Sequence, residues 1–214
     1  LNRNHMTATI IIIGVLLLPV IYNLLFPFKQ PNLNNYFTVG DTYSSKAEGI
    51  TQTITKIIGN KIYCELKFEP HAVGPPEHLH VNFNETILVV SGTLTAKVGG
   101  EIKILHAGER VIFPKGIYHS MSNQSNEEVI LRSEMDEDFV PVEFAYSLAQ
   151  LYPLMSPDRG LTFKMFLKIC VLDELFDSVP VGPPPAFFSI IKKVIKPYAR
   201  LLGATPYDSR SNPN

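Results

Sequence analysis

The sequence has little cysteine and no excess of charge of either sign. Cys64 and Cys170 are its only cysteines, and they form neither a C-x-x-C metal motif nor a disulfide framework. The net charge is -1 and no recognition motif is present, so nucleic acid is not expected as a partner. G-x-S-x-G, Walker and Cys–His catalytic motifs are also missing, which disfavours acyl and phosphoryl transfer.

Charge is absent altogether between Met6 and Phe28. A helix that rises ~1.5 Å per residue over this length can cross a hydrocarbon core ~30 Å thick, so we expect residues 1–28 to be a transmembrane anchor. A cleaved signal peptide fits less well, because the apolar run exceeds the usual ~7–15 residues and lacks a small-residue cleavage site. A buried helix is a third alternative. Arg3 and Lys29 flank the run, so the orientation of a single-pass protein is poorly determined, and the short N-terminal flank favours a body outside the cytoplasm.

After a polar linker at 29–35, residues 36–139 carry short β-type segments separated by glycine, proline and asparagine. Gly59-Asn60 and Gly99-Gly100 are two-residue hairpin signals. The expected strands are Thr51–Ile58, Lys61–Phe68, Thr86–Val90, Thr93–Val98, Glu101–His106, Arg110–Phe113, Tyr118–Ser122 and Glu128–Glu134. This succession predicts a mainly β fold, a β-barrel or jelly roll, in one domain with appendages.

Residues 140–204 are expected to form a C-terminal helical extension, and the polar residues 205–214 a disordered tail. The expected helices are Phe144–Tyr152, Leu161–Phe176 and Ala186–Leu202, the last after a proline-rich connector. The final helix is amphipathic, with an apolar stripe made of Phe187, Ile191, Val194, Tyr198 and Leu201. Either this stripe packs on the protein, or the helix lies on a membrane surface with its lysines near lipid head groups.

Three histidines and a glutamate stand at spacings that suit one metal ion. His78 and His80 are two residues apart, so in an extended strand they face the same side. Glu85 follows a short loop, and His119 follows the Pro114-Lys115-Gly116 turn. Imidazole and carboxylate ligands together suit one divalent transition metal ion such as Fe, Mn, Ni, Cu or Zn, and the sequence does not select among these ions.

These residues resemble the two signature motifs of the cupin superfamily. The first motif reads His78-Leu-His80, four residues, Glu85, six residues, Gly92, but its opening glycine is displaced, with Ala72 in that place and Gly74 two residues later. The second motif reads Gly108, Pro114-Lys-Gly116, His119 and Asn123 without a departure. The resemblance covers about half of the chain and is greatest to single-domain, cupin type-2, quercetinase-like proteins (monocupins).

The resemblance implies a jelly-roll, double-stranded β-helix barrel in which His78, His80, Glu85 and His119 hold the metal ion. It also implies that Glu85 shifts between metal ligand and proton acceptor, which makes it the catalytic candidate. The function that we expect is a membrane-anchored dioxygenase-type oxidoreductase acting on a small oxygen-bearing organic substrate. The alternative is a non-catalytic small-ligand binding or sensor module on the same scaffold. A homodimer is expected by analogy with other cupins.

Other polar residues near the motifs are assigned lesser roles. His106 is expected at the surface or in a turn, His71 has no assigned role, and Asn123 is expected to cap a turn. Glu77 either supports His78 or is exposed, and exposure is favoured. A set of apolar residues either lines a substrate cavity or fills the core, namely Phe68, Phe83, Ile87, Val89, Phe113 and Met121.

Overall fold

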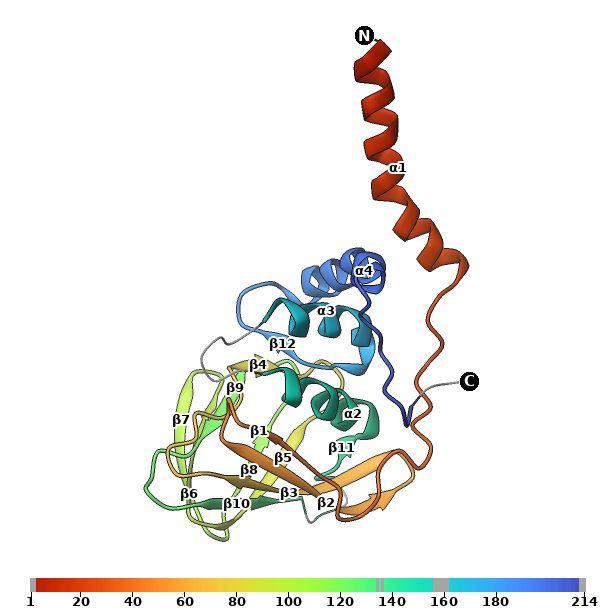
Figure 1. Cartoon of the computed structure of the whole chain (residues 1–214). Coiled ribbons are helices and arrows are strands. Elements are labelled where there is room, and N and C mark those ends of the chain that lie inside the picture. The colour runs from red at the N-terminus through yellow and green to blue at the C-terminus, as the bar shows by residue number, and fades with distance from the viewer. Residues whose placement is uncertain (1–2, 134, 136, 156–161, 212–214) are drawn as a thin grey trace.

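The computed structural model describes residues 3–133, 135, 137–155 and 162–211. A long N-terminal helix, α1 (Arg3–Leu25), projects from a β-sheet body that is covered on one side by three further helices (Figure 1). The strands of the body are β1 (Thr42–Ser45), β2 (Ile50–Ile58), β3 (Lys61–Phe68), β4 (His78–Leu79), β5 (Glu85–Ser91), β6 (Thr93–Val98), β7 (Glu101–His106), β8 (Arg110–Phe113), β9 (His119–Ser122), β10 (Val129–Arg132), β11 (Val140–Pro141) and β12 (Val179–Pro180).

The strands form two antiparallel sheets. One sheet has the order β1-β2-β3-β10-β5-β8, with β11 also paired to β3, and the other has the order β12-β4-β9-β6-β7. Large apolar side chains from both sheets, including Phe68, Leu94 and Phe113, are fully buried in one cluster. The mainly β, jelly-roll prediction is therefore confirmed.

Both predicted hairpins are present, because Ile58 pairs with Lys61 and Val98 pairs with Glu101. The Ser91-Gly92 step is different. It joins β5 in one sheet to β6 in the other, so the chain crosses between the sheets there. Gly92 has a φ of +82°, and a Cβ atom on it would lie 2.7 Å from the carbonyl oxygen of Glu128. Glycine is therefore required at this crossing for both conformation and space.

The sequence prediction missed four short strands, and three of them, β4, β11 and β12, pair with strands far along the chain. The most consequential is β12, which lies in the proline-rich segment that we expected to be a connector. Val179 pairs with Leu79 and Pro180 pairs with His78, so the C-terminal extension adds a strand beside β4. The last residue of the predicted strand Glu128–Glu134 lies outside the described residues.

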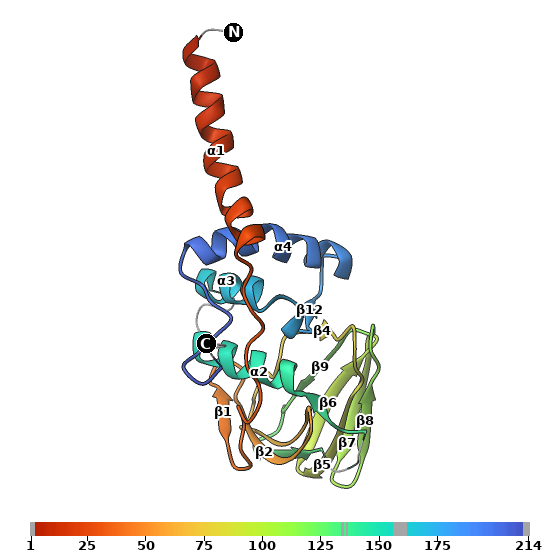
Figure 2. The same ribbon diagram turned by 90° about the vertical axis from the view of Figure 1, so that its right-hand side faces the viewer.

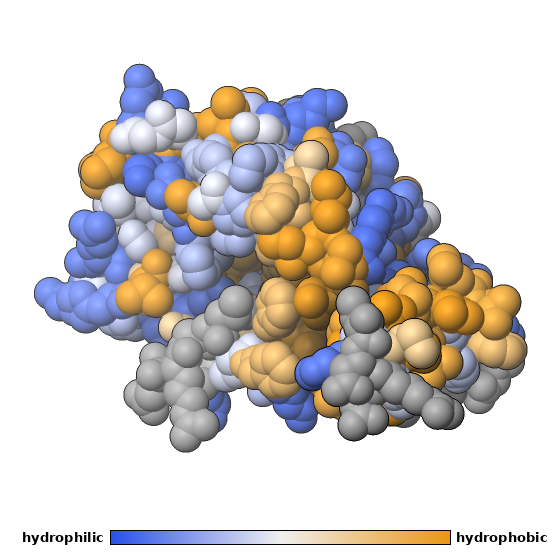
Figure 3. All heavy atoms as spheres, turned by 90° about the horizontal axis from the view of Figure 1, so that it is seen from above, coloured by the Kyte–Doolittle hydropathy of each residue, from blue (hydrophilic) through white to orange (hydrophobic). Residues whose placement is uncertain are grey.

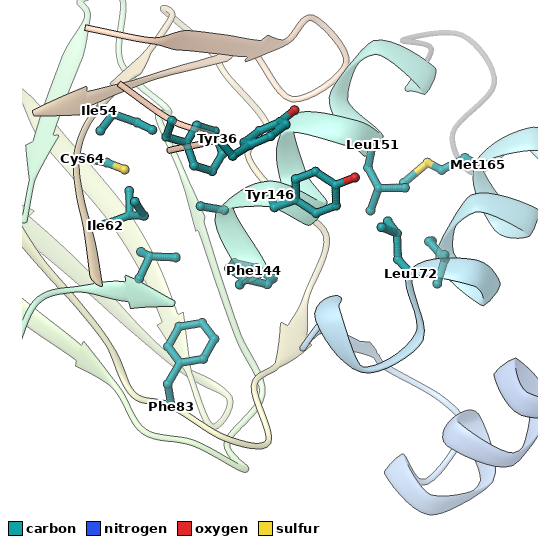
Figure 4. Packing of buried hydrophobic residues seen from close by; sticks show 14 residues of the cluster. Tyr36, Ile54, Ile62, Cys64, Phe83, Phe144, Tyr146, Leu151, Met165 and Leu172 are labelled. Atoms are coloured by element: carbon teal, nitrogen blue, oxygen red, sulfur yellow. The ribbon is translucent and has the colours of Figure 1, made fainter. Parts of the chain in front are cut away.

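The C-terminal helices extend the core of the barrel. Helix α2 (Val142–Leu151) begins two residues before the predicted start, and α3 (Phe163–Leu172) begins after Thr162, whose side chain accepts a hydrogen bond from the Met165 backbone amide. Leu161, the predicted start, lies outside the described residues. The helix ends earlier than predicted because Asp173 takes a φ of +51° and begins a short 3-10 turn. Figure 4 shows side chains of α2 between those of the strands and those of α3, Met165 and Leu172, in one buried cluster.

The last helix, α4 (Pro185–Leu201), packs on α3, but not through the predicted stripe. Phe187, Val194 and Leu201 of that stripe are exposed, whereas Lys192 and Ala199 are buried. The alternative at a membrane surface stays a prediction, whereas packing of these three side chains on the described part of the protein is not seen. The reason is that Lys192 finds a backbone acceptor, the Asp173 carbonyl oxygen at 2.7 Å, which permits a lysine to face inward.

The C-terminal segment also differs from the prediction of a disordered tail. Over Thr205–Ser211 the chain packs back on the body: the Tyr146 hydroxyl lies 2.7 Å from the Ser211 hydroxyl oxygen, and the Tyr36 hydroxyl donates to the Asp208 carboxylate at 2.6 Å. The Asn32 backbone amide donates to the Ser211 carbonyl oxygen, so the predicted linker and the tail hold each other. Residues 212–214 lie outside the described residues.

Helix α1 exposes its apolar side chains along its length. Its segment His5–Leu25 is long and apolar enough to cross a membrane, by a criterion of length and composition that signal sequences also meet. Its role as an anchor stays a prediction.

We predict that Gly74→Ala destabilises the fold far more than Gly108→Ala. Both glycines have positive φ, +70° and +90°, but a Cβ atom on Gly74 would lie 1.8 Å from the Met121 carbonyl oxygen, whereas nothing lies within 4 Å of one on Gly108. Gly108→Ala should cost about 1–2 kcal/mol for its conformation alone. Gly74→Ala should lower the free energy of unfolding by more than about 4 kcal/mol, measured by urea denaturation. Equal losses in the two variants would contradict this account.

Candidate metal centre

The four predicted ligand residues meet between the two sheets. His78 on β4 and His119 on β9 are direct cross-strand partners, and their ring centroids lie 4.6 Å apart. His80 follows two residues after His78, and Glu85 begins β5 in the opposite sheet. One ligand-type atom from each of the four side chains lies within 4.8 Å of the other three. Whether they hold a metal ion stays a prediction.

The histidines present the same ring nitrogen to the centre. The Nδ1 atoms of His78, His80 and His119 lie 2.7, 2.5 and 3.0 Å from the backbone carbonyl oxygens of Pro76, Asp177 and Ile117. A carbonyl oxygen only accepts, so each Nδ1 carries the proton and each Nε2 is left with a lone pair. This tautomer leaves each Nε2 able to bind a metal ion, and the carbonyl partners also fix the orientation of each ring.

Glu85 lies against two of these nitrogens. One carboxylate oxygen is 3.5 Å from His80 Nε2 and 3.3 Å from His119 Nε2, and neither buried nitrogen has a hydrogen-bond partner among the described residues. Unpartnered buried nitrogens are costly, and a shared cation would satisfy them together with the carboxylate. The donor set therefore fits a divalent transition metal ion.

Electrostatics within the cluster favour an ionised carboxylate. Burial by itself would raise the pKa of Glu85, but the His119 and His80 imidazoles beside its carboxylate hold that pKa well below its usual range. Burial, together with the neighbouring imidazoles, lowers the pKa of His78 to about 4. For His119 burial acts in the same direction, yet the adjacent Glu85 carboxylate outweighs it and the pKa of His119 is raised. A neutral His78 and an ionised Glu85 are the forms that bind metal.

Aromatic rings enclose the imidazoles. Phe83 stacks on His80 with ring centroids 4.2 Å apart, and Phe113 stacks on His119 at 4.6 Å. Phe144, from α2, meets the His80 ring edge-on at 4.8 Å. These phenylalanines restrict ring rotation and keep water from the back of the site, so Phe83 and Phe113 act as its wall.

Asp177 supports the centre from the C-terminal extension, and the sequence carried no signal for it. Its carbonyl oxygen holds the Nδ1 atom of His80, and its carboxylate accepts hydrogen bonds from the backbone amides of Val81 and Asn82 at 2.9 and 2.8 Å. The loop between His80 and Glu85 is thus fixed by a residue almost a hundred positions later. Only the pairing of β12 with β4 brings it there.

A cavity of about 490 Å³ adjoins the cluster, and His78, His80 and Glu85 are part of its wall. Much of the remaining wall is apolar, and it includes Phe68, Ile87 and Met121 from the barrel and Met165, Ile169 and Phe188 from α3 and α4. Phe68, Ile87 and Met121 belong to the six apolar residues that we expected either to line a cavity or to fill the core, and these three line the cavity. Val89, another of the six, is buried in the core. The site suits an organic molecule with an apolar body.

Two buried polar residues of the same wall were missed by the sequence analysis. Glu48 is 5% exposed and Gln52 is 2% exposed, and each has a side-chain oxygen without a hydrogen-bond partner among the described residues. Burial raises the pKa of Glu48 to about 7, against the lowering effect of Ser45. Glu48 is flanked by the unremarkable residues Ala47 and Gly49, so no sequence pattern marked it.

The remaining polar predictions have mixed outcomes. Asn123 does cap a turn, since its amide nitrogen donates to the carbonyl oxygens of Glu69 and Glu127 and its oxygen accepts from Ser125. His106 is exposed, as expected. Glu77 is half-buried rather than exposed and forms an ion pair with Lys97 at 2.9 Å.

Comparison with known proteins identifies the central part of the chain. A family model described as "Cupin domain" matches residues 64–133. No curated protein matches the chain.

Solved structures with similarity include KdgF from Halomonas sp., at 21% identity over 45% of this chain and 88% of that one, with a TM-score of 0.39. An RmlC-like cupin from Shewanella frigidimarina has 19% identity over 53% and 95% of the two chains, with a TM-score of 0.37. A predicted oxalate decarboxylase from Thermotoga maritima has 16% identity over 43% and 86%, with a TM-score of 0.38. Identities this low say nothing about the reaction.

We predict that Glu48→Gln removes a pH-dependent loss of stability. The folded-state pKa of about 7 lies above the usual 4.5, so between these values the folded protein keeps a proton that the unfolded chain releases. Stability therefore falls as the pH rises through this range, by up to about 3 kcal/mol. Chemical denaturation at pH 5 and pH 8 should show a smaller difference for Glu48→Gln than for the wild type. An unchanged difference would show that Glu48 does not contribute.

Proposed function

Because residues 64–133 form a cupin domain, we propose that this protein is a metal-binding cupin with His78, His80, Glu85 and His119 as ligands of one divalent transition metal ion. The observation that supports it best is the convergence of three oriented imidazole Nε2 atoms and one carboxylate in a buried site. Burying these groups together without a cation would leave His80 and His119 unsatisfied.

We further propose a dioxygenase-type oxidation of a small, oxygen-bearing organic substrate. A redox-active ion held there would supply Lewis acidity and a means of reacting a bound substrate with O₂. The apolar wall would bind the body of the substrate and exclude water, and the stacked phenylalanines would hold His80 and His119 in place. The carboxylate of Glu85 lies in the cavity wall beside the histidines, where it would accept the proton of a substrate hydroxyl group.

The alternative is a binding or sensor module that retains an apolar ligand without converting it. The same cavity favours it, because an apolar pocket of about 490 Å³ next to a cation could hold a ligand as well as a substrate. In either case α1 would be the single membrane-spanning anchor, with the body outside the cytoplasm. A homodimer stays a prediction.

We expect His119→Ala to abolish metal binding. The purified full-length protein, dialysed against a chelator and then loaded with Fe, Mn, Ni, Cu or Zn, should bind about one ion. The variant should retain less than roughly a tenth of this occupancy by elemental analysis. His106→Ala, an exposed histidine outside the cluster, is the matched control and should bind as the wild type does. Equal binding by both variants, with folding intact by circular dichroism, would refute the assignment.

We expect Glu85→Gln to separate the two functions. The amide keeps the size of the side chain but neither carries the charge nor accepts a proton at neutral pH. If the protein is an enzyme, oxygen uptake with a catechol or a flavonol should fall by about 10²-fold or more in the metal-loaded variant. The matched control is Glu77→Gln, which removes a half-buried carboxylate outside the cluster. A wild type that holds zinc, or that binds these compounds without oxygen uptake, would support the binding module instead.

A further inference from the structure

The outer face of α4 is an apolar stripe with no protein partner among the described residues. Phe187, Ile190, Val194 and Leu201 are 54%, 57%, 56% and 73% exposed. They are three, four and seven positions apart, so they lie along one side of the helix. Figure 3, which looks down on this part of the molecule, shows hydrophobic residues gathered there. Contiguous exposed apolar residues of this kind mark an interaction surface.

The opposite face of α4 packs on the rest of the protein. Ala199 is buried against α3, where it joins Leu167 and Val171. Lys192 donates to the Asp173 carbonyl oxygen at 2.7 Å, and Lys196 forms an ion pair with the Asp173 carboxylate at 3.0 Å. These contacts fix the rotation of the helix about its own axis. The apolar stripe therefore faces outward because two lysines are held on the inner side.

The C-terminal half of α4 forms hydrogen bonds with α1 and with the residue that follows it. The Tyr198 hydroxyl donates to the Leu16 carbonyl oxygen at 2.7 Å, and Arg200 donates to the Phe26 carbonyl oxygen. The Arg200 guanidinium also lies over the rings of Tyr22 and Phe28, 4.6 and 4.4 Å from their centroids. Figures 1 and 2 show α4 lying across the base of α1, on the side of the body from which α1 projects.

We propose that the outer face of α4 lies in the interfacial layer of the bilayer that α1 crosses. This inference rests on the proposed anchoring by α1. An amphipathic helix in that layer buries its apolar side at the acyl boundary and keeps charged groups at head-group level. The contacts of Tyr198 and Arg200 with α1 make the two apolar surfaces continuous. Lys193, whose side chain is 59% exposed and lies 3.9 Å from the exposed Glu174 carboxylate, is the cation of α4 that can reach anionic head groups.

The position of α4 also points to the class of substrate. Phe188, the neighbour of the outward-facing Phe187, lines the cavity beside the metal cluster, together with Phe166 and Ile169 of α3. One helix thus forms part of the cavity wall with one side and the lipid-facing surface with the other. The ligand that fits this arrangement is an apolar molecule that partitions into the bilayer and carries an oxygen group for the metal centre.

A single tryptophan tests the placement, because the chain has none. Full-length Phe187→Trp protein is reconstituted into phosphatidylcholine–phosphatidylglycerol vesicles with or without brominated acyl chains. Its emission should be blue-shifted, and brominated lipid should quench it by roughly twofold or more. The matched control is Ile104→Trp, which replaces a residue that is 54% exposed on β7, and it should be quenched little. Ile190→Trp serves as a second reporter if Phe187→Trp does not fold.

The outcomes separate the two proposals. If the protein does not float with the vesicles after a carbonate wash, the anchoring by α1 fails and the placement of α4 falls with it. If it floats but both α4 reporters are quenched no more than Ile104→Trp, only the placement of α4 is overturned. A blue shift without bromine quenching would mean that another protein surface, such as a second copy of the chain, covers the stripe, and it would overturn the proposal equally.

Discussion

Three imidazole rings and a carboxylate converge in an interior where unpaired polar atoms are costly, and much of the structure serves to hold them there. Each histidine donates a hydrogen bond from Nδ1 to a backbone carbonyl oxygen. The Nε2 atoms are therefore directed at one another, at Glu85 and at any added ligand. The aromatic rings that stack on His80 and His119 prevent these side chains from turning away. A cation is the one addition that satisfies nitrogen lone pairs and a carboxylate together.

The C-terminal extension is part of this centre and not an appendage to a finished barrel. Its short strand β12 pairs with the strand that carries His78, and Asp177 fixes the loop between His80 and Glu85. Phe144 and α3 extend the apolar wall beyond the sheets. A barrel without this extension would have a more open site, so the extension decides both the size of the cavity and the apolar character of much of its wall.

The same extension links the centre to α1. Asp173, just after α3, accepts a hydrogen bond from Lys192 at its carbonyl oxygen and forms an ion pair with Lys196 at its carboxylate, and these two contacts set which face of α4 turns outward. Tyr198 and Arg200 then connect α4 to α1. A series of polar contacts thus connects the cavity wall with the apolar outer surface of the molecule. Burial of the amine, normally unfavourable, is tolerated because the acceptors at Asp173 are close.

The sequence by itself determined what depends on short-range pattern: the three histidines and the glutamate at fixed spacing, the Gly59-Asn60 and Gly99-Gly100 hairpins, and the apolar N-terminal helix. The turn and strand chemistry of these segments is local, so a few neighbouring residues suffice to specify it. Only the tertiary structure decided that Asp177 and β12 support His78 and His80, that Glu48 lines the cavity, and that α4 turns its lysines inward. Each of these depends on an acceptor, a strand edge or a cavity supplied by residues distant in sequence, which periodicity and composition do not record.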